Sequence, residues 1–258
     1  MTQAQHPYPG LGLANRLIGG TANRLTPFYR RHPYRGDLWW SEVDMRVVVC
    51  PQTGFLYNRL PKNANSTVTS LLANRIFGPD DAVSPKHRFV RPSRLSAAQV
   101  RAVETDYFKF VILRDPYTRT LSAFLDKVMK PRTQRRGPWR WFARHGIETP
   151  SFEDFCKYLD DGGLHADNHW APQVDGLVLP LDRFDMVARL EALQADLDTI
   201  HRRLFGAPLG ELQRKGPKST GAEGEIARHY TPHAAEIVSR LFARDFSELG
   251  YPVRDVTA

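Results

Sequence analysis

Cysteine is scarce in this chain of 258 residues, which contains Cys50 and Cys156 and no other cysteine. The two lie far apart in the sequence, and neither belongs to a C-x-x-C pair or to a His/Cys spacing typical of metal sites. These absences exclude a disulfide scaffold, and we expect no metal site. Cys50 ends an apolar run, which predicts a buried thiol in a strand.

Long apolar runs are also missing. No stretch approaches the roughly 20 apolar residues that a membrane helix needs, and the N-terminus lacks the basic, apolar and small-residue segments of a secretory signal. We therefore expect no transmembrane segment and a cytoplasmic protein. Hydrophobic residues nevertheless make up 41% of the chain and aromatic residues 11%, which is enough for a folded core and excludes a disordered protein.

Negative charge is in the minority, because 36 Lys and Arg residues face 28 Asp and Glu residues and leave a net charge of +8. This sign favours an anionic partner, such as a nucleotide, an acidic glycan, a nucleic acid or an anionic membrane surface. A nucleic-acid-binding protein is the alternative of a different class, but the sequence has neither a zinc-finger spacing nor a sustained basic helix. We therefore expect no nucleic acid partner. Nothing in the chain indicates its oligomeric state.

The order of apolar runs and turn signals predicts an α/β fold. Residues 1–40, rich in Pro, Gly and aromatic residues, predict an irregular N-terminal arm, and residues 41–258 predict a single domain. Two strands are expected at 45–50 and 55–60 with a tight turn between them, and a buried strand at 108–113. Helices are expected after residue 65, after Pro116, and at 151–159, 189–205 and 232–243. This alternation favours three layers, with a central, mostly parallel sheet flanked by helices.

A polar loop follows the second expected strand and leads directly into a helix. Its residues are Lys62, Asn63, Ala64, Asn65, Ser66 and Thr67. Backbone N–H groups at the start of a helix favour an anion, to which Lys62 would add charge and Ser66 and Thr67 hydroxyl donors. The G-x-x-x-x-G-K spacing is absent, which counts against an ATPase, a GTPase or a related kinase. Alternatively, Asn65 or Ser66 only caps the helix and Lys62 is solvated.

Arg114, at the end of the strand expected at 108–113, is a second anion signal. Asp115 is the expected N-cap and Pro116 the first residue of the next helix, and Ser122 follows two helical turns later. An arginine can bind a phosphate through two parallel hydrogen bonds, and Ser122 can donate another. Alternatively, Arg114 forms a structural ion pair and Ser122 lies on a packed helix face.

Together, segments 60–67 and 108–127 resemble the phosphosulfate loop and the 3′-phosphate site of sulfotransferases that use 3′-phosphoadenosine-5′-phosphosulfate (PAPS). The likeness is to the Golgi-type carbohydrate sulfotransferases (sulfotransferase family 2) and their bacterial relatives. Segments 169–173, 185–187 and 245–251 also resemble family elements, so the resemblance covers about residues 45–252. The loop residues 63–65 depart from the glycine or cysteine that many members carry. The cysteines and membrane anchor of Golgi members are missing, which favours a soluble, bacterial-type enzyme.

The resemblance implies a P-loop-like sulfotransferase fold, PAPS as donor and PAP as product, with no metal. It implies transfer of a sulfuryl group to a hydroxyl of a carbohydrate or glycoconjugate. A small-molecule or lipid alcohol is the alternative acceptor, and a noncatalytic PAP-binding protein would carry the same motifs. Lys62 would stabilise the leaving oxygen and residues 63–67 would bind the 5′ end of the donor, while Arg114 and Ser122 would bind the 3′-phosphate.

The acceptor hydroxyl needs a base, for which histidine is the first candidate type. His87 lies between the two donor segments, and His169, in segment 169–173, is the other candidate. Alternatively, His87 is an exposed loop histidine in a basic run, and His169 is a structural hydrogen-bonding residue that lines the acceptor cleft. Glu42, Asp44 and Asp167 stay open as alternative bases.

Two basic stretches lie outside these motifs. Arg214, Lys215 and Gly216 resemble a short element that closes over the nucleotide in cytosolic sulfotransferases, although a solvated loop is the alternative. Residues 130–144 predict an exposed loop or short helix, whose Trp139 and Trp141 could contact a sugar or acidic acceptor. Alternatively, the stretch is only a solvated face.

Overall fold

The computed structural model describes residues 9–80, 82–210 and 221–257. Contacts divide the chain into two compact units. The sheet unit comprises residues 13–113 and 177–217, and the helical unit comprises residues 1–12, 114–176 and 218–258. The boundary between the two units falls inside the range 41–258 that we predicted as a single domain. The single domain therefore stays a prediction.

A four-stranded sheet in the order β1-β2-β3-β4 is the centre of the sheet unit. Strands β1 (Val47–Cys50) and β2 (Phe55–Asn58) form the predicted antiparallel hairpin, in which Val47 lies opposite Asn58. Strand β3 (Phe108–Leu113) runs parallel to β2, and β4 (Met186–Arg189) runs parallel to β3. The sheet is therefore mixed, with its antiparallel hairpin at one edge.

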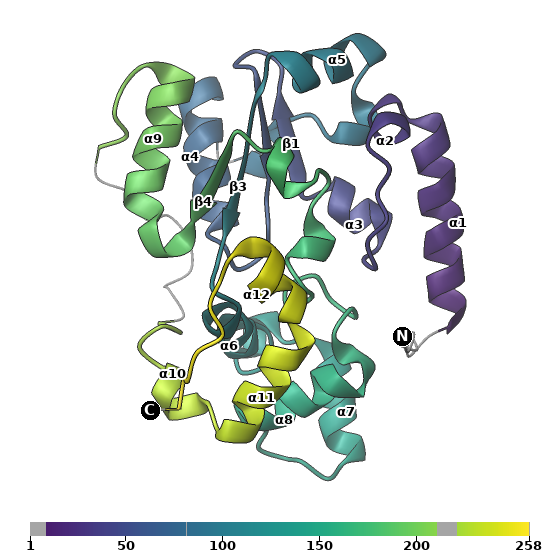
Figure 1. Ribbon diagram of the computed structural model, residues 1–258, viewed down its shortest axis with the longest axis vertical. Helices are drawn as coiled ribbons and strands as arrows, with labels where there is room; N and C mark the ends of the chain where they lie inside the picture. The colour runs from purple at the N-terminus through teal and green to yellow at the C-terminus, as the bar shows by residue number, and fades with distance from the viewer. Residues whose placement is uncertain (1–8, 81, 211–220, 258) are drawn as a thin grey trace. The chain divides into compact units, whose positions relative to one another are not determined.

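Both faces of the sheet are buried. On one face, Tyr57 stacks on Phe110 with ring centroids 4.6 Å apart, and both pack in a core cluster with apolar residues of α4 (Asn65–Phe77) and α9 (Leu193–Phe205) (Figure 1). The alternate residues Val49, Leu56 and Val111 are also completely buried. Burial on both faces explains why these strands are continuous apolar runs in the sequence.

The N-terminal arm differs from the prediction. Residues 9–25 form helix α1 (Pro9–Leu25) where we expected irregular chain. Leu, Ala and Arg residues, together with a proline at the first helical position, outweigh its glycines. Beyond it, Phe28 and Tyr29 of α2 are completely buried.

The bounds of the other elements of this unit are α2 (Pro27–Arg31), α3 (Trp40–Asp44), η1 (Pro85–Arg88), η2 (Pro92–Arg94), α5 (Ala97–Thr105), η6 (Leu181–Arg183) and η7 (Leu190–Ala192).

The helical unit packs its helices around aromatic side chains, among them Phe124, Phe155 and Trp170. Its first helix, α6 (Pro116–Lys127), begins as predicted, with the Asp115 carboxylate accepting a hydrogen bond from Thr118 N at 2.9 Å. The predicted helix at 232–243 is confirmed as α11, which ends at Leu241, and a further helix begins at Ala243. The other elements are η3 (Pro131–Thr133), α7 (Arg136–Arg144), α8 (Phe152–Tyr158), the π-helical turn η4 (Leu159–Gly163), η5 (Val174–Gly176), α10 (Ile226–His229), α11 (Pro232–Leu241) and α12 (Ala243–Leu249).

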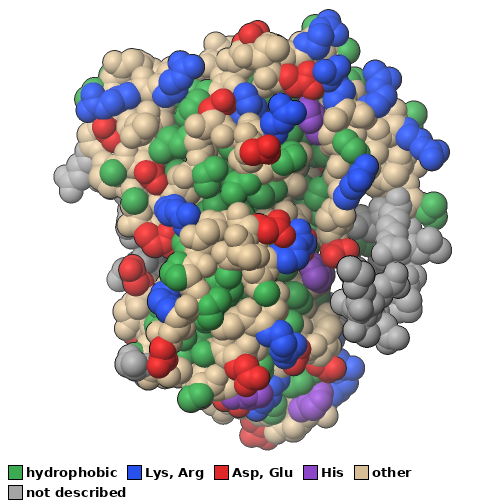
Figure 2. Space-filling model, in the orientation of Figure 1, with side chains coloured by type: hydrophobic (Ala, Val, Ile, Leu, Met, Phe, Trp, Pro, Cys, Tyr) green, Lys and Arg blue, Asp and Glu red, His purple; other side chains and the backbone are tan. Residues whose placement is uncertain are grey.

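The surface carries charges of both signs. On the face drawn in Figure 2, Lys and Arg side chains lie among Asp and Glu side chains. Within the described ranges, no helix combines the length and the apolar character that crossing a membrane requires.

Candidate functional site

The loop between β2 and α4 has an unusual backbone. Lys62 and Ala64 are the described non-glycine residues with positive φ, at 71° and 55°. Such conformations are costly for residues with a side chain and persist only where the surroundings fix them. Here the buried Asn63 side chain donates from Nδ2 to the carbonyl of Ile112 at 2.8 Å, and Asn65 Nδ2 donates to the carbonyl of Leu60 at 3.2 Å. The loop is thus fastened to the carboxyl end of β3 and to its own beginning at Leu60.

Helix α4 begins at Asn65 without a side-chain cap. Its N-cap is Ala64, so neither Asn65 nor Ser66 fills the capping role that we left open. Ser66 is exposed, whereas Lys62 and Thr67 are half-buried. The N–H groups in the first turn of a helix attract an anion when no side chain caps them. The start of α4 therefore fits a phosphate or sulfate group, and the sequence-predicted residues 62–67 lie together around it.

The acids and the histidine expected elsewhere in the sheet unit have other surroundings. Asp44 is buried, and accepts hydrogen bonds from Tyr29 Oη at 3.1 Å and from Ser93 Oγ at 2.7 Å, which assigns it to packing. Glu42 pairs with Arg46 at 3.5 Å. His87 lies on the short helix η1 with an exposed side chain.

Arg114 begins the helical unit directly after β3, and its backbone is held by a glutamine. Arg114 N donates to Gln173 Oε1 at 3.1 Å, and Gln173 Nε2 donates to the Arg114 carbonyl at 2.8 Å. The guanidinium Nε donates to Thr118 Oγ1 at 3.0 Å. Ser122 lies farther along α6 and is buried. The two residues predicted for the 3′-phosphate therefore share one strand-to-helix segment.

Segment 167–175 is clamped by a buried arginine and a buried aspartate. Arg119, which is 1% exposed, donates to the carbonyls of Ala171 at 2.8 Å and Asn168 at 3.3 Å. Burial lowers the pKa of Arg119 to about 10, and the Asp245 charge opposes that shift. Asp245 accepts from Gln173 N at 2.8 Å and from Val174 N at 3.0 Å. Burial raises the pKa of Asp245, and the Arg119 charge acts in the opposite direction.

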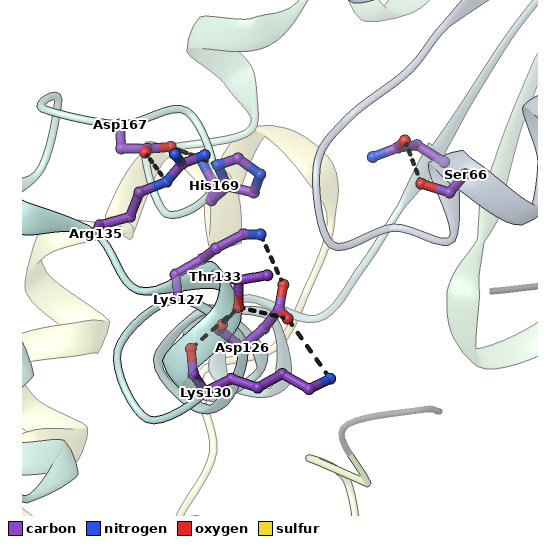
Figure 3. A network of polar contacts seen from close by, with 9 residues as sticks. Ser66, Asp126, Lys127, Lys130, Thr133, Arg135, Asp167 and His169 are labelled. Carbon is purple, nitrogen blue, oxygen red and sulfur yellow. Dashed lines mark hydrogen bonds and ion pairs between the residues drawn. The ribbon is translucent and has the colours of Figure 1, made fainter. Parts of the chain in front are cut away.

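His169 lies within this clamped segment and contacts a carboxylate. Its Nδ1 is 2.5 Å from Asp167 Oδ1, while Asp167 Oδ2 pairs with Arg135 Nε at 2.9 Å (Figure 3). Burial acts to raise the pKa of Asp167, but the hydrogen bonds from His169 and the Arg135 charge lower it overall. Asp167 is therefore an anion at neutral pH.

A second cluster of charges lies at the end of α6. Asp126 pairs with Lys127 Nζ at 3.1 Å and with Lys130 Nζ at 4.0 Å (Figure 3). These lysines are thus partly neutralised by a neighbouring carboxylate.

The tryptophans of stretch 130–144 pack against the core of the helical unit to different degrees. Trp141 of α7 is 7% exposed and donates from Nε1 to Asp161 Oδ2 at 2.6 Å. Trp139 is half-buried against the core of the helical unit and donates to the Val128 carbonyl at 3.1 Å. The amphipathic helix turns Trp141 and Phe142 into the core and leaves its arginines outside, so the ring of Trp141 is not available to an acceptor, and an acceptor contact by the rest of this stretch stays a prediction.

Three predicted residues, Arg214, Lys215 and Gly216, lie outside the described residues. Conversely, sequence reasoning missed Arg119 as a buried anchor. A signal was present, since an arginine among apolar residues of a helix points to a specific buried partner. It also missed the hydrogen bond from Gln173 to Asp245, two residues that lie in separate family-like segments.

Comparison with known proteins identifies the class. Residues 45–252 match the sulfotransferase family, and the chain belongs to that family. Carbohydrate sulfotransferase 10 of Danio rerio is 28% identical over 245 residues, which cover 80% of this chain and 66% of that protein. The Homo sapiens protein of the same name is 29% identical, with 81% and 68% covered. Carbohydrate sulfotransferase 14 of Mus musculus is 29% identical, with 86% and 65% covered.

The chain thus spans about two thirds of the length of these relatives. No solved structure matches it significantly.

Proposed function

We propose that this protein is an enzyme that transfers the sulfuryl group of PAPS to a hydroxyl of a carbohydrate or glycoconjugate and releases PAP. Membership of the sulfotransferase family supports the reaction, and the names of the relatives support a carbohydrate acceptor. The observation that carries the proposal is the strained loop after β2, which places Lys62 and two hydroxyls at the uncapped start of α4. A strand, a phosphate loop and a helix in this order also support a P-loop-like fold.

The residues of the loop fit the 5′ end of the donor. Ser66, Thr67 and the backbone N–H groups of α4 would bind the 5′-phosphosulfate, because each can donate a hydrogen bond to an anionic oxygen. Sulfuryl transfer displaces a phosphate oxygen from sulfur, so negative charge builds on that oxygen in the transition state. Lys62 would stabilise this charge, and its contribution is larger in the transition state than in the bound donor.

Arg114 and Ser122 would bind the 3′-phosphate. A guanidinium suits a phosphate because its N–H groups match two phosphate oxygens at once. The backbone of Arg114 is already fixed by Gln173, so the main chain needs no rearrangement to present this side chain. We propose this 3′-phosphate role as the reason why the nucleotide of PAPS is selected over ATP, which has no 3′-phosphate.

Calorimetric titration with PAP tests the donor site, with ATP as the control ligand. Wild-type protein should bind PAP at micromolar concentration and far more tightly than ATP. Arg114→Ala should weaken PAP binding at least tenfold, as expected from the loss of one charge-assisted contact. The backbone bonds to Gln173 do not depend on the Arg114 side chain, so the fold should persist. Equal affinities for PAP and ATP would contradict the donor assignment.

Turnover of radiolabelled PAPS tests the enzyme itself. Lys62→Gln removes the charge and keeps a polar side chain in the same backbone position. We expect kcat to fall by about a hundredfold or more, which is typical of losing one transition-state donor, with a much smaller change in PAP affinity. A noncatalytic PAP-binding protein would bind PAP and transfer no sulfuryl group to any glycan in an acceptor panel.

A further inference from the structure

The Asp167 carboxylate is fixed through both of its oxygens. Oδ1 lies 2.5 Å from His169 Nδ1 and accepts the His169 backbone N–H at 2.9 Å, while Oδ2 pairs with Arg135 at 2.9 Å. The side chains of Asp167 and His169 are 18% and 15% exposed. The carboxylate is therefore mostly shielded from water and has a defined orientation towards the imidazole ring (Figure 3).

This contact determines which ring nitrogen carries the proton. A carboxylate only accepts hydrogen bonds, so the close contact requires a proton on Nδ1 of His169. In the neutral imidazole the lone pair then belongs to Nε2. An aspartate that holds Nδ1–H in this way gives a histidine the tautomer of a general base at Nε2.

The backbone that carries His169 is also fixed. Arg119 donates to the carbonyls of Asn168 and Ala171, on either side of it in the chain. The next residue, Trp170, is 1% exposed and donates from its indole nitrogen to the Gly163 carbonyl at 2.9 Å. A base must hold its nitrogen in position to accept a proton in the transition state. The clamp described above supplies this rigidity.

Three other described histidines lack this arrangement. In His165 it is Nε2, and not Nδ1, that contacts the buried carboxylate of Asp175, at 2.9 Å. Asp175 also pairs with Arg244 of α12, so the carboxylate joins η5 to α12. His145 places Nδ1 2.8 Å from the Trp141 carbonyl and stacks on the Trp141 ring. His87 is exposed on η1. The geometry distinguishes His169 from these three.

We propose that His169 is the catalytic base for the acceptor hydroxyl and that Asp167 is the positioning residue that fixes its tautomer. This inference rests on the proposed function. The acceptor hydroxyl transfers its proton to Nε2 while its oxygen forms a bond to sulfur. The bond between sulfur and the phosphate oxygen breaks, and its electron pair leaves with PAP. His169 later releases the proton to water.

Two arginines contact the surroundings of His169 besides Asp167. Arg135 pairs with the Asp167 carboxylate, and the buried Arg119, whose charge is opposed by Asp245, donates to the neighbouring carbonyl of Asn168. Asp167 is the acid in direct contact with the ring, so replacing it by a neutral group should destabilise the imidazolium and lower the pH at which the base becomes protonated.

The test compares Asp167→Asn and His169→Ala in the full chain, with His233→Ala as a matched control because that side chain is 55% exposed. We expect His169→Ala to lower kcat by about a hundredfold or more. Asp167→Asn should lower kcat at least tenfold, since an amide can also donate to Nδ1 and so favour the wrong tautomer. It should also move the acid limb of the kcat–pH profile to lower pH. PAP affinity and the control should be unchanged.

Histidine side-chain ¹⁵N NMR gives a second readout that needs no turnover. The wild-type spectrum should show His169 protonated at Nδ1, and Asp167→Asn should lose this preference. An unchanged kcat and pH profile in Asp167→Asn, or a loss of activity in His87→Ala but not in His169→Ala, would overturn the inference. A wild-type chain with the expected His169 tautomer and PAP binding, but no sulfuryl transfer to any acceptor, would instead refute the proposed function.

Discussion

Replacing Arg119 by methionine should destabilise the protein far more than replacing any surface arginine. Arg119 is 1% exposed and makes two hydrogen bonds to carbonyls of segment 168–171. Hydrogen bonds from a charged donor are worth about 1.5–3 kcal/mol each, which gives about 3–6 kcal/mol for the pair. Methionine recovers part of this by apolar packing, whereas Asp245 loses its opposing charge. We expect a net loss of about 3–5 kcal/mol, a large fraction of the stability of an ordinary domain.

Urea unfolding followed by tryptophan fluorescence measures this loss, because Trp170 lies within the clamped segment. Arg228→Met is the matched control, since its side chain is 79% exposed and pairs only loosely with Glu225 at 3.6 Å; it should change stability by less than about 0.5 kcal/mol. The double variant with Asp245→Asn should cost less than the sum of the single variants, with a coupling of about 1–3 kcal/mol. A cost below about 1 kcal/mol for Arg119→Met, or strict additivity, would refute the reasoning.

Three further changes test other parts of the helical unit. Gly163→Ala should cost about 1–3 kcal/mol in urea unfolding, because a Cβ there would lie 2.5 Å from the backbone oxygen of Tyr158. In the control Gly224→Ala, the new Cβ meets nothing closer than 3.7 Å, so this change should be nearly neutral. Similar costs for the two variants would contradict the steric argument. Asp115→Ala should cost about 1–2 kcal/mol by removing the cap of α6, and a thermal denaturation midpoint equal to wild type would argue against this role. The pKa of Asp167 in the folded state is below its ordinary value of 3.8, so its stabilising contribution is present above that pH and is lost as the pH falls through the folded pKa. Asp167→Asn should therefore flatten the acid side of the curve of stability against pH. An unchanged slope between neutral pH and about pH 3 would show that the pairing contributes nothing.

Local signals predicted the strand-to-helix segments well. The runs at 55–60 and 108–113 are apolar because both faces of the sheet are covered, and Asp115 with Pro116 is a complete helix start within two residues. Strand β4 was missed because its four residues include only a short apolar core, and it becomes a strand by pairing with β3. That pairing depends on residues far away in the chain, which periodicity does not report.

Long-range polar contacts were equally hidden. Gln173 and Asp245 are 72 positions apart, and nothing in either neighbourhood indicates that one binds the other. The loop around Lys62 was predicted as an anion site from its residue types, but its left-handed backbone was not, because neither lysine nor alanine favours that conformation. The burial of Trp141 in α7 was not predicted, because the arginines around it dominated the interpretation of a segment whose helical spacing places this ring inside.

The amide of Gln173 has a consequence for how a nucleotide would associate. By bonding to both the N–H and the carbonyl of Arg114, it satisfies both main-chain polar groups of that residue. Glutamate could not do this, because it lacks the donor. The main-chain entropy of Arg114 is therefore lost during folding, so the proposed contact with a 3′-phosphate would order the side chain of Arg114 and not its backbone. This prearranged backbone should lower the entropic cost of that contact.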